Sequence, residues 1–100
     1  MINHVVLFKL KKYESLGQKQ DVIGSIEEAL LCLKDKISEL KYIEVGINYE
    51  LEAKSYDLCL ISHFENIEEL DAYRVHPEHL KVVELIGLHA VDRGAVDFEF

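Results

Sequence analysis

The chain has 100 residues, with 19 acidic and 11 basic side chains, a formal net charge of −8 and 49% hydrophobic residues. This length fits a single domain, residues 1–100, and the apolar content is too high for a disordered chain. With Arg74 and Arg93 as its two arginines, the acidic chain is not expected to form a basic patch, to bind nucleic acid or to bind an anionic membrane. A domain of this size buries about 65% of the surface that its unfolded chain exposes, so a lone monomer would be marginally stable.

Two cysteines and the apolar runs indicate the compartment. Cys32 and Cys59 lie in apolar surroundings, so we expect free, buried thiols in a reducing environment rather than a disulfide. We expect no signal peptide, because no charged leader precedes a long apolar run. The apolar runs are also too short for a transmembrane helix. These features favour a cytoplasmic protein.

The first half of the chain predicts a strand followed by a long helix. Residues 2–10 are rich in β-branched and aromatic side chains, and both faces of this strand are apolar. Ser15 and Gln18 have the spacing of a capping box, which predicts a helix start. The helix is expected to carry one apolar stripe over about five turns, formed by Ile23, Ile26, Leu30, Leu33, Ile37 and Leu40.

The second half predicts two strands, two short helices and a last strand. Alternation indicates strands at 42–49 and 56–64, with 50–55 as a polar connection. Asn66 and Glu69 predict a helix start, and Pro77 predicts the first residue of another helix. The first short helix would bury Ile67, Leu70 and Tyr73, and the second would bury Leu80, Val83 and Ile86 or Leu88. Residues 89–100 alternate again, with Arg93 and Asp97 on one face of the last strand.

The order β-α-β-β-α-β predicts an α+β, ferredoxin-like fold, in which helices cover one face of a four-stranded antiparallel sheet. The strands at 2–10 and 56–64 are nevertheless apolar on both faces. A second copy of the chain packed against the uncovered face would solve this, so we expect a homodimer formed through the sheet, a dimeric α/β barrel.

Three segments carry a resemblance to a known family. In the first strand, His4 precedes an apolar run that ends in Phe-Lys, and 56–66 runs from Tyr-Asp-Leu to Phe-Glu-Asn. The segment 72–80 contains the pattern Tyr73-x-x-His76-Pro77-x-His79, and the ending with Asp-Arg at 92–93 also fits. With these motifs the chain resembles the stress-responsive α/β-barrel (Dabb) family over essentially its whole length.

This resemblance implies a homodimeric α+β barrel, and most members of the family have no established biochemical role. In a plant member that is a polyketide cyclase, the positions of His79 and Tyr73 hold the general base and its helper. His4 matches a further pocket histidine. The plant enzyme has another His and a Tyr where this chain has Leu58 and Leu30.

The histidines also have structural interpretations. His76 precedes Pro77 at a helix start, where it can brace the turn or line a ligand pocket. His79 lies in the first helical turn, where the helix dipole favours a neutral imidazole that can act as a base. His4 can be a core residue, or it can meet Tyr73 and His79 in one apolar pocket.

Three functions therefore stand as hypotheses. The first is a homodimer that binds a small hydrophobic or aromatic molecule, and the second is a cofactor-independent, aldol-type cyclase with His79, Tyr73 and His4 as catalytic residues. The third is a protein similar to heme or quinol monooxygenases. The sequence contains no phosphate loop or dinucleotide fingerprint, and the spacing of His76 and His79 alone is weak evidence for zinc. We therefore expect no cofactor and no metal.

Overall fold

The structure, a computed structural model, describes residues 1–51 and 54–100. Its elements follow in the order β1 (Ile2–Leu10), α1 (Leu16–Leu31), the 3-10 helix η1 (Cys32–Asp35), β2 (Tyr42–Ile47), β3 (Leu58–Phe64), α2 (Ile67–Arg74), α3 (Pro77–Gly87) and β4 (Ala90–Glu99). The four strands form one antiparallel sheet in the order β2-β3-β1-β4. The predicted ferredoxin-like α+β fold is confirmed.

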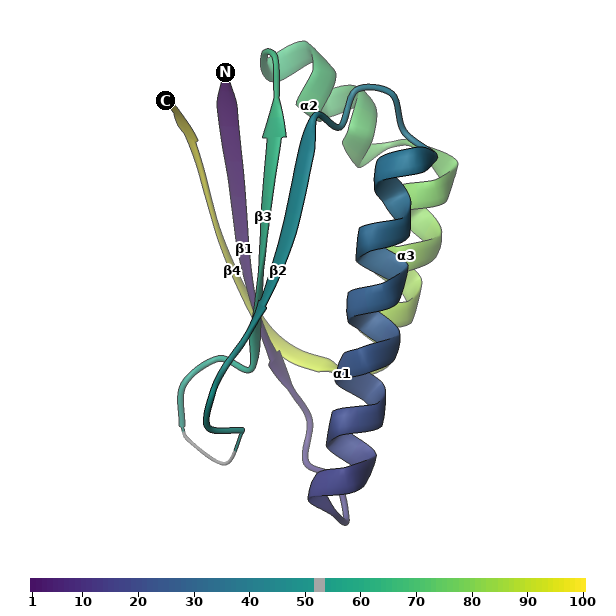
Figure 1. Ribbon diagram of the computed structural model, residues 1–100, viewed down its shortest axis with the longest axis vertical. Coiled ribbons are helices and arrows are strands. Elements are labelled where there is room, and N and C mark those ends of the chain that lie inside the picture. The colour runs from purple at the N-terminus through teal and green to yellow at the C-terminus, as the bar shows by residue number, and fades with distance from the viewer. Residues whose placement is uncertain (52–53) are drawn as a thin grey trace.

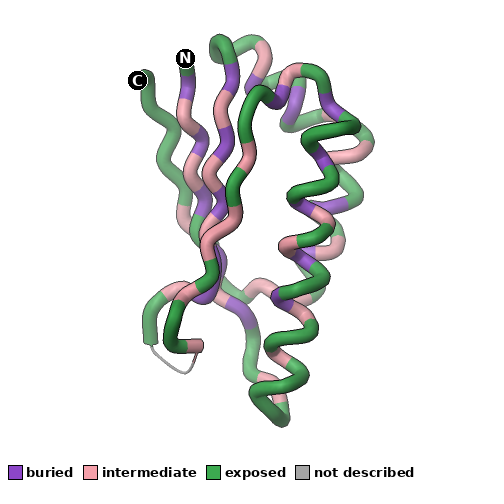
Figure 2. Tube along the Cα trace, in the orientation of Figure 1, coloured by how far each residue is buried: buried purple, intermediate pink, exposed green. Residues whose placement is uncertain are grey.

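One face of the sheet packs against α1 and α3, which lie side by side along it (Figure 1). Alternate residues of β1 and β3 point toward these helices and are buried, as the banded colouring of the strands shows (Figure 2). His4 is among them at 5% exposure, between buried Ile2 and Val6. The core therefore lies between the sheet and the helices, and His4 is one of the few polar residues buried in it.

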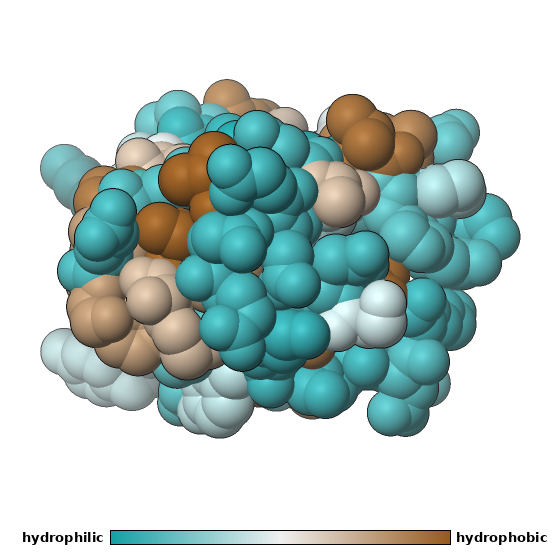
Figure 3. Space-filling view, turned by 90° about the horizontal axis from the view of Figure 1, so that it is seen from above, coloured by the Kyte–Doolittle hydropathy of each residue, from teal (hydrophilic) through white to brown (hydrophobic). Residues whose placement is uncertain are grey.

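The opposite face of the sheet is apolar and has no covering layer within the described chain. The ladder places Val5 beside Ile61 and Val96, so all three share this face. Val96 is 62% exposed and Phe98 45% exposed. Seen from above, apolar residues are exposed on the sheet side of the molecule, and another apolar group is exposed on its helical side (Figure 3). The predicted two-sided character of the strands is thus present in the structure.

The long helix is shorter than its apolar stripe. It ends at Leu31 and tightens into η1, where the backbone N–H of Lys36 bonds to the carbonyl of Leu33 at 3.1 Å. Ile37 and Leu40 are still buried, but they lie in the turn that leads to β2. The prediction of a five-turn helix was wrong. Ile37 and Leu40 continue the apolar spacing because they are buried in the core, although they are not part of a helix.

The buried faces of the two short helices also differ from the prediction. In α2, Ile67 is 48% exposed, whereas Leu70 is buried as expected. In α3 the buried residues are Val82 and Ile86, and the expected Leu80 and Val83 are about half exposed. Helix α3 carries two apolar stripes, and only one of them can face the sheet.

Neither cysteine is buried. Cys32 is exposed because η1 turns Leu33 toward the core instead, and Cys59 is half-buried on the uncovered face of the sheet. Both are free thiols, as predicted. Among the described residues, no helix is both long enough and apolar enough to cross a membrane.

Candidate functional site

A cavity of ≈ 310 Å³ lies between the helix-facing side of the sheet and α3. Strands supply His4, Val6, Phe8, Leu60 and Arg93, and helices supply Leu30, Arg74, His79, Val82, Val83, Ile86 and Gly87. Its volume is at the lower end of the range for small-molecule sites, and its lining is mainly apolar with a few polar groups. Gly87 contributes open space, because a Cβ atom there would meet nothing within 4 Å.

His4 is held by a carboxylate from the neighbouring strand. The β1–β4 register places it beside Asp97, and its Nδ1 atom bonds to Asp97 Oδ1. Asp97 Oδ2 accepts a second bond from Arg74 Nη2 at 2.7 Å. An ionised carboxylate only accepts, so His4 Nδ1 carries the hydrogen and the neutral ring keeps Nε2 as an acceptor. Burial lowers the pKa of His4 despite the opposing effect of Asp97.

His79 has the same arrangement on the helical side of the cavity. Pro77 starts α3, so His79 lies in its first turn, and its Nδ1 donates to the backbone carbonyl of Arg74 at 3.1 Å. The neutral ring then presents Nε2 as a proton acceptor. Burial is the main reason why the pKa of His79 is lowered, and the charges of Arg93 and Arg74 lower it further. Both imidazoles can therefore be neutral bases near pH 7.

Tyr73 lies behind these imidazoles and does not line the cavity. It is completely buried, with its ring centroid 4.2 Å from that of His79 and 6.3 Å from that of His4. Its hydroxyl has no hydrogen-bond partner among residues 1–51 and 54–100. Burial raises the pKa of Tyr73 to about 12, so the phenol stays protonated at neutral pH. The structure thus brings the rings of His4, Tyr73 and His79 close together, but only the two histidines line the cavity.

The other histidines lie outside this cavity. His76 caps α3, since its Nδ1 accepts a bond from the backbone N–H of Glu78 at 3.1 Å. His63 stacks on Tyr42 on the uncovered sheet face, with ring centroids 4.7 Å apart. His89 bonds through Nδ1 to the hydroxyl of Tyr13 at 2.8 Å. The contacts of His76 therefore agree with a role in bracing the turn, and His76 is not among the residues that line the cavity.

Three functional groups at the cavity were not expected from the sequence. Both arginines of the chain line it, and Asp97 orients His4. The sequence contained a signal for two of them, because strand alternation places Arg93 and Asp97 on one face of β4. In the sheet, Arg93 pairs with Phe8 and Asp97 pairs with His4. What the pattern could not show is that the end of α2 brings Arg74 to the same place.

The expected absence of a basic patch was also wrong. A second hollow, between the end of β1 and the start of α1, is lined by five of the nine lysines in the chain: Lys9, Lys11, Lys12, Lys19 and Lys54. Two of these ammonium groups share one buried carboxylate, Asp57, whose Oδ1 lies 2.8 Å from Lys19 Nζ and 3.7 Å from Lys9 Nζ. Lys9, Lys11 and Lys12 are clustered in the sequence, and the fold adds Lys19 and the distant Lys54 to them.

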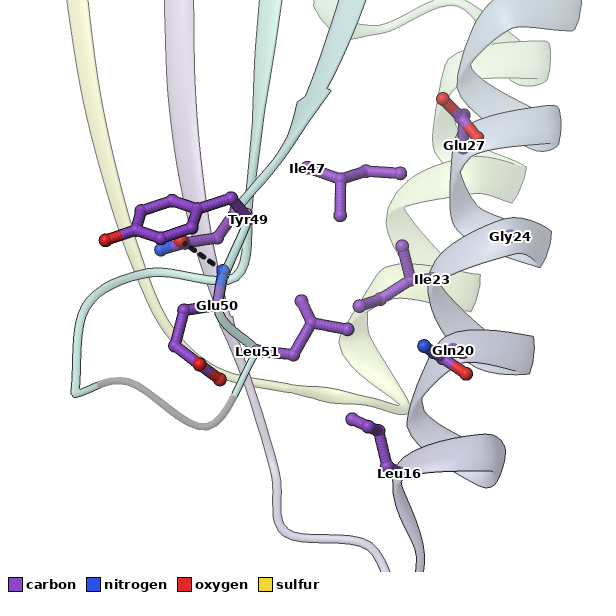
Figure 4. Close-up of a pocket in the computed structure, with 10 residues that line it drawn as sticks. Leu16, Gln20, Ile23, Gly24, Glu27, Ile47, Tyr49, Glu50 and Leu51 are labelled. Carbon is purple, nitrogen blue, oxygen red and sulfur yellow. Dashed lines mark hydrogen bonds between the residues drawn. The ribbon is translucent and has the colours of Figure 1, made fainter.

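A third hollow lies between α1 and the segment after β2 (Figure 4). Ile23 of α1 points toward Ile47 and Leu51 across it, while Tyr49 points away from the helix. Its ionisable groups among the described lining residues are two carboxyls and the phenol of Tyr49, with no imidazole or cationic group among them. Among the described residues, no group of three His, Cys, Asp or Glu side chains could hold a metal ion. The cavity with His4 and His79 is therefore the better candidate for chemistry.

Similar proteins support the family and the fold. An uncharacterised protein of Streptomyces coelicolor is 31% identical over 85 residues, covering 85% of this chain and 86% of that protein. A stress-response A/B barrel domain-containing protein of Arabidopsis thaliana is 29% identical over 98% of this chain, which spans 46% of that protein. A dimeric protein of unknown function with a ferredoxin-like fold from Bacteroides fragilis is 34% identical, with a TM-score of 0.89 over 99% of this chain and 95% of that chain.

More distant structures show the fold alone. A hydroxynitrile lyase from Passiflora edulis is 15% identical with a TM-score of 0.75, covering 97% of this chain and 90% of that chain. An antibiotic biosynthesis monooxygenase is 13% identical with the same TM-score, covering 100% and 98%. The model of the stress responsive A/B barrel domain matches residues 2–100. The chain therefore belongs to the stress responsive A/B barrel domain family.

Proposed function

We propose that this protein is a cytoplasmic homodimer that binds a small apolar molecule in the cavity between its sheet and α3. The observation that carries the proposal is the lining of the ≈ 310 Å³ cavity, which is apolar except for two imidazoles and two guanidinium groups. Ligand sites of this kind combine an apolar body with a few oriented polar groups. The half-exposed edge of α3 around Val83 gives a ligand a route to His4 and His79.

The sheet face opposite the helices supports the dimer. Its apolar side chains extend over three adjacent strands, from Ile61 through Val5 to Val96. Soluble monomers rarely expose a continuous apolar patch of this kind. The similar Bacteroides fragilis structure is described as dimeric. We therefore expect two sheets to pack face to face, with the helices on the outside.

Analytical ultracentrifugation of a matched pair of variants tests the dimer. Val96→Asp places a charge on the uncovered sheet face, and Val75→Asp places the same charge at an exposed site on the helical side. We expect Val96→Asp to be monomeric at micromolar concentration, and both the original protein and Val75→Asp to be dimeric. A dimeric Val96→Asp, or a monomeric original protein, would contradict the proposal.

Two glycines allow a matched test of the ligand site. Gly87→Leu would fill the cavity, whereas Gly24→Leu would add the same group to the hollow of Figure 4. Neither new Cβ atom meets a neighbour within 4 Å. A neutral aromatic ketone such as acetophenone should shift the imidazole C–H signals of His4 and His79 in the original protein and in Gly24→Leu, but not in Gly87→Leu. Equal binding by both variants would place the ligand elsewhere.

A second candidate function is proton removal from a carbon next to a carbonyl group. It is favoured by the bond from His79 Nδ1 to a backbone carbonyl, which leaves Nε2 as the base. In such a step the C–H bond breaks, its proton moves to His79 Nε2, and its electron pair forms an enolate. The cationic groups of the cavity would stabilise the enolate oxygen. Tyr73 would act from behind, by packing against the His79 ring.

Exchange of the ketone's α-protons in deuterated water tests this second function. We expect catalysed exchange in the original protein and in His76→Asn, because asparagine also caps helices and His76 is outside the cavity. His79→Gln should lose it. Exchange that His79→Gln retains would refute the role of His79 as base and leave the binding function standing.

A further inference from the structure

We infer that the ligand of this cavity is a monoanion, an apolar carboxylate, and that the guanidinium group of Arg93 binds its charge. This inference rests on the proposed function, since it names the class of molecule that the same cavity takes. It follows from where the positive charges of the chain lie and which of them are already paired.

Both arginines of a chain with a net charge of −8 line one apolar cavity. The need to solvate the guanidinium groups does not explain why both lie at this cavity, because other parts of the protein surface could solvate them equally well. Arginine is the side chain best suited to bind a carboxylate, since its planar N–H groups match the two oxygens. The two guanidinium groups therefore give the cavity a local preference for anions that opposes the charge of the whole molecule.

The two arginines are not equivalent. Arg74 is held by two carboxylates, with Nη1 at 2.9 Å from Asp71 Oδ1 and Nη2 at 2.7 Å from Asp97 Oδ2. Arg93 forms no side-chain hydrogen bond or ion pair with any residue of 1–51 or 54–100. Its backbone pairs with Phe8 of β1, so the side chain starts directly above an apolar wall of the cavity. Within the described part of the chain, Arg93 is thus an unpaired cation at a preformed apolar site.

The charge balance of the lining allows one negative charge. The imidazoles of His4 and His79 are neutral near pH 7, because burial lowers the pKa of both. Asp97, which also contacts His4, compensates the charge of Arg74. Asp71 is 61% exposed and lies outside the cavity lining, so Arg93 supplies the remaining positive charge at the cavity. A single carboxylate neutralises it, whereas a phosphate dianion would leave one charge without a partner beside an apolar wall.

The remaining lining describes the rest of the ligand. From Arg93 the cavity continues along Phe8, Val6 and Leu60 to Val82 and Ile86, which are all apolar. A carboxylate bound by Arg93 would therefore direct an aliphatic or aromatic body inward, toward the Nε2 atoms of His4 and His79. A neutral molecule of the same shape would leave the guanidinium without its partner.

A matched pair of probes separates charge from shape. 3-Phenylpropanoate and 3-phenylpropanamide have nearly the same size, and only the first is an anion at pH 7. We would titrate each into the protein at low ionic strength and follow the imidazole C–H signals of His4 and His79 by NMR. The carboxylate should bind about tenfold more tightly than the amide, as expected for a charge-assisted hydrogen bond in a partly dry site.

Three variants assign this difference to Arg93. Arg93→Gln should abolish the preference for the carboxylate and leave amide binding unchanged, whereas Arg93→Lys should retain part of it. Lys81→Gln removes one positive charge from an exposed position on α3 and should change neither affinity by more than about twofold. Unfolding curves would show that the variants remain folded.

Each outcome decides the inference. Equal affinity for the two probes, or an unchanged preference in Arg93→Gln, would overturn it while the proposed apolar site stands. A preference lost equally in Lys81→Gln would also overturn it, because the effect would then come from the net charge of the molecule. If neither probe shifts His4 or His79, the inference and the proposed binding function both fail.

Discussion

The hydroxyl of Tyr73 provides the sharpest test of the structure. It is buried, and no hydrogen-bond partner for it lies within the described residues. Leaving such a group unsatisfied costs about 1–3 kcal/mol, because its bonds to water are lost without replacement. Tyr73→Phe removes the hydroxyl and keeps the ring contacts with Phe64 and His79, at 4.8 and 4.2 Å between centroids. We expect the free energy of unfolding to rise by about 1 kcal/mol or more.

Tyr13→Phe is the matched control. Its hydroxyl bonds to His89 Nδ1 at 2.8 Å, so the same substitution should lower the free energy of unfolding by about 1 kcal/mol. Thermal unfolding followed by circular dichroism measures both, since 1 kcal/mol shifts the Tm of a domain of this size by about 4–8 °C. Protomer concentration must be the same throughout, because dimerisation makes Tm depend on it. The two variants should shift Tm in opposite directions.

The pKa of Tyr73 gives the same argument a second readout. Because burial raises this pKa to about 12, the folded protein holds a proton that the unfolded chain releases near pH 10. Stability must therefore fall as the pH rises from 10 to 12, and Tyr73→Phe should make this fall less steep. If Tyr73→Phe were destabilising by 1 kcal/mol at pH 7, the hydroxyl would have a partner and the reasoning would be refuted.

Three further predictions concern an ion pair, two histidines and a glycine. Asp57→Ala should lower the free energy of unfolding by about 3–5 kcal/mol in denaturant titrations, because it breaks a buried ion pair; a loss below 1 kcal/mol would show that the site is hydrated. Stability should fall as the pH drops below 6.5, because burial lowers the pKa of His4 and His79 in the folded state, so the unfolded chain binds protons first. The double variant His4→Gln/His79→Gln should show a flatter profile of stability between pH 5 and 7. Gly46→Ala should lower Tm, since its Cβ would lie 3.0 Å from Cys59 Sγ, and adding Cys59→Ala should restore it; an unchanged Tm in the single variant would mean that the sulfur moves aside.

The fold could be predicted from the sequence because the helix-capping signals, the helical spacing of apolar residues and the two-residue alternation of the strands indicate the same elements. Ser15 and Asn66 accept backbone bonds at the starts of α1 and α2, as their spacing to Gln18 and Glu69 predicts. Pro77 stands at the first position of α3. These signals act within three residues, so they do not depend on tertiary structure. Strand alternation likewise placed His4 on the buried face.

The errors arise where two local patterns compete or where distant residues decide. Helix α3 has an apolar stripe through Leu80 and Val83 and another through Val82 and Ile86, and only docking on the sheet selects the second. The expectation of no basic patch came from overall composition, which does not show that Lys54 joins the lysines at 9–19 in space. Arg93 was accordingly placed on the correct face but given no function.

The cavity also concentrates local features that a fold selected for stability alone would avoid. Two groups in or beside it lack a partner among residues 1–51 and 54–100: the buried phenol of Tyr73 and the guanidinium of Arg93. Burial lowers the pKa of its two imidazoles, those of His4 and His79. Away from the cavity, Asp57 accepts bonds from Lys19 and the backbone of Leu10, and Tyr13 bonds to a histidine, whereas Asn3 Oδ1 is a buried atom without a partner among the described residues. Polar groups that are energetically unfavourable in the free protein often cluster at functional sites, because a ligand or a reacting group supplies the missing partner. Since an anion is the partner that the guanidinium lacks, the same reasoning that locates the site also indicates what enters it.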